Sequence, residues 1–298
     1  MSAEKPLPNY GGQAVIEGVL MRGTRTYSIA VRIPDRSILI ETQDFGSAHR
    51  ARWLRVPFLR GLLVLWESLV IGIRALTFSA NAQAEEESER LEGTSLTLTL
   101  LGAIAIALFG FLLLPAGAAV LLQRILGITD LASIVIEGAI RLSLLIGYVW
   151  SIGRMPEIER VYGYHGAEHM TIHAFEAGAP LTPESIRTFP REHPRCGTAF
   201  LLTVALLSIL LFSLLGPLPL LARLASRIVF IPVLASLAYE YIRFTARFSD
   251  RAWAKLLMWP NLALQRLTTR SPSLGMLEVA VASFEAMRRR EDEFEVPG

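Results

Sequence analysis

The stretch YHGAEHMTIHAFEAGAPLTPESIRTFPREHPRCGT, residues 164–198, holds four of the five histidines of the chain and its only cysteine. Residues 165–169 within it match H-x-x-E-H, the inverted zincin order. In that order, two histidines one helical turn apart bind zinc and the glutamate is the general base. The sequence therefore predicts a helix with His165 and His169 on one face as metal ligands and Glu168 beside them as the catalytic residue.

Further ligands follow in the same stretch. A zinc ion takes three protein ligands in a catalytic site or four in a structural site, and one straight helix seldom supplies them. His173 continues the histidine stripe, and Glu176 follows near the same face. The chain then returns with His193 and Cys196 on an extended turn. We expect a divalent metal ion, zinc by ligand type, bound by His165, His169, His173, His193 and Cys196, with Glu176 in support.

Simpler interpretations of this segment stay open. A histidine stripe at helical spacing also suits the polar face of an amphipathic helix near a membrane. Cys196 can belong to a turn that starts the next helix. Glu168 can equally orient a ligating imidazole instead of acting as a base.

The composition is that of an integral membrane protein. Apolar residues make up 52% of the 298 residues and charged residues only 19%, which is too apolar for an ordinary soluble domain. A single cysteine excludes an intramolecular disulfide. Arginines 288–290 are followed directly by acidic residues, so nucleic-acid binding has little support. We therefore expect the lipid bilayer as a partner and no nucleic acid.

Four apolar runs predict a mainly α fold with about four transmembrane helices as two hairpins. They are residues 96–122, 131–150, 199–216 and 228–248. The first is uncharged over a length that crosses a bilayer. The second contains Glu137 and Arg141, which can pair at i and i+4, and the fourth is broken by Pro232.

Residues 58–80 are also apolar, but they carry Glu67 and Arg74. Because spanning would place two charges in the hydrocarbon, we expect an interfacial or buried amphipathic helix there. Lysines and arginines number 11 before residue 96, five between 151 and 198 and eight after 243, and only three lie in the two short turns between spans. The positive-inside rule then puts both termini and the histidine segment in the cytoplasm.

The N-terminal region predicts a small antiparallel β cap of about three strands in the cytosol. Residues 11–23 form an apolar run bracketed by glycines, and two alternating runs follow up to residue 43. Glu17 is awkward in such a strand unless it meets a partner, so we expect it near the histidine segment, within reach of an imidazole or of Arg22. A salt-bridged strand pair is an equal alternative.

Three amphipathic helices are expected after the last span, on the cytoplasmic bilayer surface or packed on the N-terminal sheet. They cover residues 250–258, 261–268 and 274–290, separated by prolines. The predicted organisation is a β-rich cap (1–57), an amphipathic interfacial helix with an acidic connector (58–95), a first transmembrane hairpin (96–150), a cytosolic histidine-rich segment (151–198), a second hairpin (199–248) and cytosolic amphipathic helices (249–298).

Four blocks of the sequence resemble the YqhQ-like family of bacterial membrane proteins, which carry domain of unknown function 1385. They are GGQAVIEGVLMRG at 11–23, YHGAEHMTIHAFE at 164–176, HPRCGTAFL at 193–201 and LQRLTTRSP at 264–272. The resemblance implies a predicted metal-dependent enzyme in the bacterial inner membrane, without an assigned activity. Inverted zincins take a downstream glutamate as third ligand, whereas Glu240, Glu278 and Glu285 here stand in no obvious ligand setting.

Two functions are consistent with these observations. The first is a membrane-embedded, zinc-dependent hydrolase with its site at the cytoplasmic face, acting on a small molecule, lipid or peptide. The second is a non-catalytic membrane protein in which the histidine segment is a structural metal site or hydrogen-bonded cluster and the cytosolic face binds a protein partner.

Overall fold

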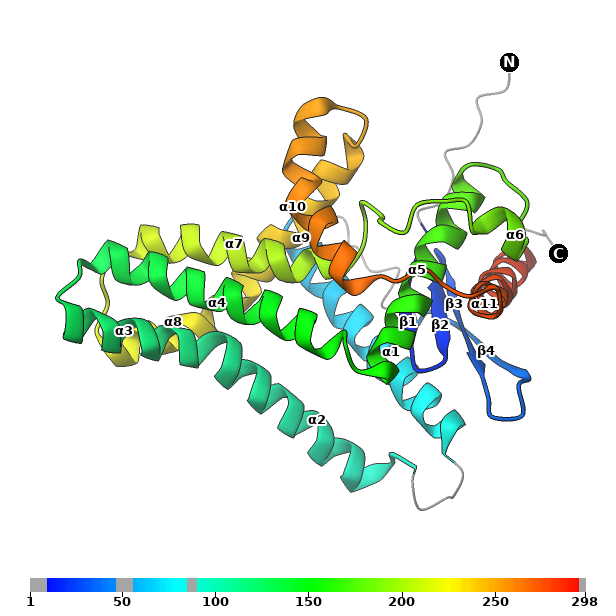
Figure 1. Cartoon of the computed structure of the whole chain (residues 1–298), viewed down its shortest axis with the longest axis horizontal. Helices are drawn as coiled ribbons and strands as arrows, with labels where there is room; N and C mark the ends of the chain where they lie inside the picture. The colour runs from blue at the N-terminus through cyan, green and yellow to red at the C-terminus, as the bar shows by residue number, and fades with distance from the viewer. Residues whose placement is uncertain (1–9, 47–55, 85–89, 295–298) are drawn as a thin grey trace.

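The computed structural model describes residues 10–46, 56–84 and 90–294. The chain is mainly helical, with a small sheet near its N-terminus (Figure 1). The helices are α1 (Leu59–Gln83), α2 (Gly93–Leu108), a π-helical turn η4 (Phe109–Leu113), α3 (Leu114–Leu126), α4 (Asp130–Ile152), α5 (Pro156–Glu176), α6 (Pro183–Ile186), α7 (Thr198–Leu215), α8 (Leu220–Val229), α9 (Ile231–Arg247), α10 (Ala252–Thr268) and α11 (Leu274–Glu293). Figure 1 shows α3, α4, α7 and α8 reaching to one end of the molecule, and the sheet with α5, α6 and α11 at the other.

The sheet has four antiparallel strands in sequential order. They are β1 (Gly11–Val15), β2 (Gly18–Arg22), β3 (Thr26–Arg32) and β4 (Ile38–Asp44). The prediction of a small N-terminal sheet is confirmed, but residues 11–23 form a hairpin where one strand was expected. Val15 pairs with Gly18 across a two-residue turn, and Glu17 in this turn has a φ of 52°. Tight hairpin turns require such left-handed backbone angles.

Helices cover both faces of this sheet. On one face, residues of β2 pack with α5 and with Leu277, Phe284 and Met287 of α11. On the other face, Leu20 and Ile29 pack with α1. The apolar stripe predicted for the last helix is therefore buried against the N-terminal sheet and does not lie on a bilayer surface, so the two ends of the chain form one unit.

Four helices are long and apolar enough to cross a membrane: Leu59–Gln83, Gly93–Leu126, Asp130–Ile152 and Thr198–Leu215. The last three correspond to predicted spans. The fourth predicted span, residues 228–248, is a bent arrangement in which α8 and α9 meet at 46°, and Pro232 lies in the first turn of α9. Counted as one, this pair makes a fifth candidate span. Insertion and orientation in the membrane remain predictions.

Helix α1 was predicted to be interfacial or buried, and Ile71 and Ala75 do pack on the sheet. Its length and composition also suit a span, so its place relative to the membrane stays a prediction. Both of its charges pair with strands of the sheet. Glu67 pairs with Arg22 of β2. Arg74 pairs with Glu41 of β4 at 3.3 Å.

Two prolines inside helices are accommodated in different ways. The π-helical turn η4 directly precedes Pro115, and it widens the helix where the ring would otherwise crowd the preceding turn. Pro260 was predicted to separate two helices, but α10 runs through it. Just beyond the proline, Asn261 donates to the Thr203 hydroxyl of α7 at 3.2 Å, a buried contact that helps to hold the two helices together.

Candidate metal centre

Helix α5 carries the histidines, and its glycines allow close contacts with the segment that follows α10. A Cβ at Gly166 would lie 2.3 Å from the carbonyl oxygen of Arg270. The Arg270 N–H in turn donates to the carbonyl of Tyr162 at 2.9 Å. Only a residue without a side chain permits this backbone contact. The contact brings the C-terminal end of α10 against His165.

Three potential ligands converge between α5 and the start of α7. His165, His169 and Cys196 each offer one ligand atom, and the three atoms lie within 4.8 Å of one another. His165 Nε2 is 3.2 Å from Cys196 Sγ, and the two imidazole rings are 4.4 Å apart. All three residues are buried. The structure therefore brings together three of the five predicted metal ligands.

Backbone carbonyls orient both imidazoles of this triad. The Nδ1 atom of His165 is 2.8 Å from the Thr268 carbonyl oxygen, and Nδ1 of His169 bonds to the Arg191 carbonyl. A carbonyl only accepts, so Nδ1 carries the proton and the Nε2 lone pair is available for a ligand. Nε2 of His169 is buried and has no hydrogen-bond partner among the described residues. The lone pair of this nitrogen could therefore bind a metal ion.

The other predicted ligands form a second, adjacent group of His173, Glu176 and His193. The Arg195 guanidinium pairs with Glu176, and His173 Nε2 donates to the Glu192 carbonyl at 2.9 Å. His193 Nδ1 accepts from the Arg195 N–H at 3.3 Å, which leaves its proton on Nε2, 3.7 Å from Glu176. The Arg195 guanidinium thus already neutralises the carboxylate of this group, although Nε2 of His193, like Nε2 of His169, has no hydrogen-bond partner among the described residues.

Charge and burial agree with this assignment. Burial opposes ionisation of Glu176, but the neighbouring His193 and Arg195 hold its pKa at about 2. Burial lowers the pKa of His193 to about 4, so its imidazole is neutral at physiological pH. The second group is a hydrogen-bonded hub around an ionised carboxylate.

Residues of α10 hold this loop in place, and the sequence analysis did not single them out. Gln265 is fully buried. Its side-chain oxygen accepts from the His193 N–H at 2.8 Å, and its nitrogen donates to the His193 carbonyl at 3.0 Å. Both Gln265 and Thr268 lie in the block LQRLTTRSP, which was the only sequence signal that pointed to them.

Glu168 is buried beside the triad but outside it. The group of three ligand atoms does not include its carboxylate. Strand β1 covers it: a Cβ at Gly12 would lie 2.8 Å from Glu168 Cγ. Burial raises the pKa of Glu168 to about 7, against the opposing influence of His165. Gly12 thus allows the N-terminal sheet to approach the histidine helix closely.

The prediction for Glu17 and Arg22 needs correction. Glu17 does reach the histidine helix, but it pairs with Arg160 and accepts from the Tyr164 hydroxyl at 3.3 Å. It meets neither an imidazole nor Arg22. The turn position of Glu17 projects it toward the first half of α5, whereas the imidazoles lie further along the helix. Arg22 points to the opposite face of the sheet, where it pairs with Glu67.

Two of the glutamates that follow the histidine segment are engaged elsewhere. Glu240 pairs with Arg60 of α1, and Glu278 pairs with Arg32 of β3 at 2.9 Å. Neither belongs to a group of ligands around the triad. The third potential ligand of the triad is Cys196, whereas inverted zincins take a downstream glutamate.

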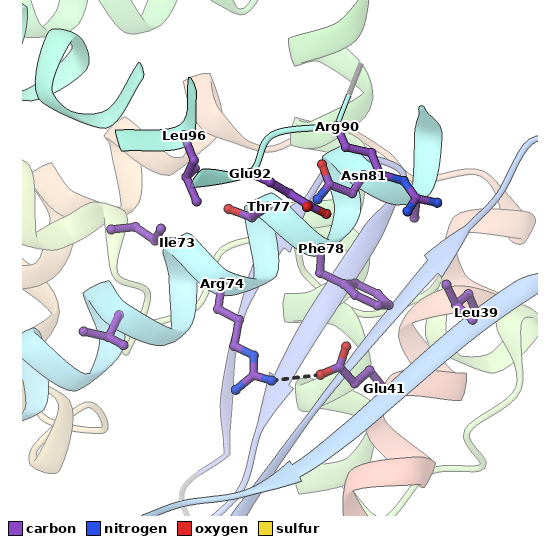
Figure 2. A pocket seen from close by; sticks show the side chains of 12 residues that line it. Leu39, Glu41, Ile73, Arg74, Thr77, Phe78, Asn81, Arg90, Glu92 and Leu96 are labelled. Atoms are coloured by element: carbon purple, nitrogen blue, oxygen red, sulfur yellow. Dashed lines mark hydrogen bonds and ion pairs between the residues drawn. The ribbon is translucent and has the colours of Figure 1, made fainter. Parts of the chain in front are cut away.

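A large cavity lies away from this centre. It has a volume of about 600 Å³ and lies between α1, β4 and the segment that leads into α2. Figure 2 shows Arg74 and Glu41, two of its lining residues, joined as an ion pair. The triad does not line it, so we assign this cavity no part in the metal centre.

Together these features define a class of protein: helices suited to a membrane, a small covering sheet, and a histidine–cysteine centre where the two meet. A family model described as "Protein of unknown function (DUF1385)" matches residues 56–290. The chain is 34% identical to "Uncharacterized protein YqhQ" of Bacillus subtilis (strain 168), over 98% of this chain and 96% of that protein. The chain therefore belongs to the DUF1385 family. No solved structure matches it.

Family membership confirms the resemblance seen in the sequence. Neither description names an activity, a metal or a substrate. The metal-dependent chemistry must be argued from the centre itself.

Proposed function

We propose that this protein is a membrane-bound, zinc-dependent hydrolase whose metal is held by His165, His169 and Cys196 at the cytoplasmic face of the bacterial inner membrane. The observation that carries the proposal is the buried Nε2 of His169, which lacks a partner in the described residues. Leaving such a group unpaired costs about 1–3 kcal/mol, and an ion shared with His165 and Cys196 removes that cost. Imidazole and thiolate are ligands that zinc prefers.

The number of ligands favours a catalytic site. Within the described ranges, no fourth histidine, cysteine or carboxylate joins the three ligand atoms. Structural zinc sites are closed by four protein ligands, whereas catalytic sites have three and an open position. When bound, zinc supplies a Lewis acid that lowers the pKa of water towards about 7.

Residues of the chain would supply the proton transfer and the orientation. Glu168, beside the ligands and outside their group, is suited to accept a proton from the attacking water and return it to the leaving group. The carbonyls of Thr268 and Arg191 keep both Nε2 atoms turned inward. The Thr198 N–H donates to Cys196 Sγ at 3.4 Å, a contact that helps to hold the sulfur in place.

A second candidate function is a structural metal clip without catalysis. The observation that favours it is burial: His165, His169 and Cys196 are 8%, 1% and 7% exposed. In that case the metal ties α5 to the loop before α7, and the cytosolic face binds a protein partner.

The variant Glu168→Gln distinguishes these functions. We would measure the metal content of detergent-purified protein by elemental analysis and test hydrolysis on ester, phosphoester and peptide substrates. The hydrolase proposal expects Glu168→Gln to keep its metal and lose on the order of 100-fold or more in rate. If wild-type protein holds zinc but hydrolyses no substrate class, and Glu168→Gln loses metal and folding together, the structural clip is correct. Wild-type protein without metal would overturn both.

A further inference from the structure

A buried charged cluster lies between α4, α7 and α8, at the end of the molecule away from the sheet (Figure 1). Glu137 accepts hydrogen bonds from Arg141 at 2.8 Å and from Arg223 at 2.9 Å. Arg227 donates to both oxygens of the same carboxylate, at 2.7 and 2.5 Å. The predicted pair within α4 is confirmed, but two arginines from α8 join it. These four side chains are at most 7% exposed.

The cluster carries more positive than negative charge. Three guanidinium groups surround one carboxylate, which gives a formal charge of +2 (3 − 1) for these four described residues. The remaining contacts are to neutral groups, such as the Ser208 hydroxyl and the Phe111 carbonyl, which accept from Arg141 at 2.7 and 3.0 Å, and the Phe212 ring, which lies beside Arg227. Glu137 lies seven residues into α4, roughly 10 Å from its start at the helical rise per residue. Unbalanced charge at such depth is costly, so an additional anion would stabilise this end of the molecule.

A cavity of about 450 Å³ opens onto this cluster. Arg223 and Arg227 line it from within, and Arg124 and Asp130 line it at the α3–α4 turn. Asp130 already accepts from Gln123 at 2.6 Å. Among the described residues, the cluster and the lining of the cavity together contain four arginines and two carboxylates, which gives a formal charge of +2 (4 − 2).

The start of α8 adds to the positive potential. Residues 216–220, which lead into its first turn, line the same cavity, and no side chain caps this turn. The free N–H groups of a first helical turn favour an anion. Independent features, namely buried arginines and an uncapped helix, therefore meet at one cavity.

We infer that this cavity binds a phosphate group, at a site separate from the metal centre. The planar fork of arginine suits phosphate oxygens. Three arginines line this space: Arg124 at the rim, and Arg223 and Arg227, whose guanidinium groups also bond to Glu137. Large apolar side chains of α3 and α8 beside the cavity are exposed: Leu121, Ile125, Leu126 and Leu221. In a bilayer such side chains contact acyl chains, so the headgroup of an anionic phospholipid is the expected source of the phosphate. Free phosphate offers the same chemistry.

The test compares the thermal stability of the full chain in nanodiscs of phosphatidylcholine with and without phosphatidylglycerol. Phosphatidylglycerol should raise Tm, because a ligand of the native state stabilises it. In detergent, inorganic phosphate is compared with chloride at equal ionic strength. Stabilisation by phosphatidylglycerol alone identifies a lipid headgroup, and an equal effect of inorganic phosphate identifies free phosphate as sufficient.

Variants locate the effect. Arg124→Gln, at the exposed rim, should reduce the rise in Tm caused by the anion by roughly threefold and leave the fold intact. Arg223→Gln should abolish the response if it still purifies as a monodisperse protein. The matched control is Arg187→Gln, an exposed arginine of the loop after α6 that does not line the cavity. The inference is overturned if neither anion raises Tm above its control, or if Arg124→Gln and Arg187→Gln respond alike.

Discussion

Two groups of three ligand-type side chains lie next to each other between α5 and the segment before α7, and they differ in what already surrounds them. In the first, His165, His169 and Cys196 face one another, and one buried nitrogen has no partner in the described structure. In the second, an arginine and a backbone carbonyl already contact Glu176 and His173. The rings of His169 and His193 are only 5.6 Å apart. Each group also contains one buried imidazole nitrogen without a hydrogen-bond partner among the described residues, Nε2 of His169 and Nε2 of His193. What distinguishes the second group is therefore the Arg195 guanidinium, which already pairs with its carboxylate.

The largest expected effect separates the two groups directly. His169→Gln should weaken zinc binding by at least about 100-fold, because it removes a proposed ligand. Mutation of residues that only hydrogen-bond to a ligand already lowers metal affinity by about 10- to 100-fold. His173→Gln, one turn further along α5, should bind zinc like the wild type. Competition against a chromogenic chelator measures both affinities. Equal losses would mean that the two groups act as one site.

A second prediction concerns the support that the hub gives to the metal centre. Gln265→Ala removes both hydrogen bonds to the buried backbone of His193, which belongs to the loop that carries Cys196. We expect zinc affinity to fall by about 10- to 100-fold, as for other residues that position ligands. The matched control is Gln123→Ala, at the far end of the helical hairpins. An unchanged affinity in Gln265→Ala would show that the triad holds its geometry without the hub.

A third prediction tests the contact between β1 and Glu168. Gly12→Ala places a Cβ 2.5 Å from the Leu20 carbonyl and 2.8 Å from Glu168 Cγ, and such overpacking costs about 1–3 kcal/mol. Gly11→Ala is the control, because nothing lies within 4 Å of its Cβ. Thermal unfolding should show a lower Tm for the first variant only. If both variants unfold with the wild type, β1 does not pack on the histidine helix as described.

The smallest effect is a pH dependence that belongs to the hub. The pKa of His193 is lowered from 6.5 to about 4. As the pH falls from 6.5 to 4, the unfolded chain therefore binds a proton before the folded chain does, and the free energy of unfolding decreases. The pKa of Glu176 is lowered from 4.5 to about 2, so its contribution is lost as the pH falls through that range. Glu168, with its pKa raised to about 7, has the opposite effect. As the pH falls from 7 to 4.5, the folded chain binds the proton before the unfolded chain does, and this contribution to the free energy of unfolding increases.

Thermal unfolding of chelator-treated variants separates these contributions. His193→Gln should flatten the loss between pH 6.5 and 4, and Glu176→Gln should flatten the loss below 4.5. His173→Gln serves as the control, with the wild-type profile. A profile unaltered by all three substitutions would argue against the ionised hub.

Several features could be predicted because their signals are local. The H-x-x-E-H spacing places His165 and His169 on one helical face, and the uncharged run of residues 96–122 indicates a span on length alone. Other features could not. The hairpin at residues 11–23 depends on one left-handed residue, Glu17. A proline ends a helix only where packing does not compensate for it, and the contact between Asn261 and α7 provides such packing just beyond Pro260.

The sequence by itself determined the type of protein, the helix that carries the ligands and the set of side chains from which they come, because helical periodicity and hydropathy act over a few residues. The tertiary structure alone decided which three ligands meet, and that Glu17 pairs with Arg160 and not with an imidazole. It also decided that Arg223 and Arg227 join Glu137. The contacts of Cys196 with the two histidines, of Glu17 with Arg160 and of Glu137 with the arginines of α8 all join residues more than 25 positions apart. Which residues pair at such separations depends on how buried charges and hydrogen bonds are satisfied in the whole fold.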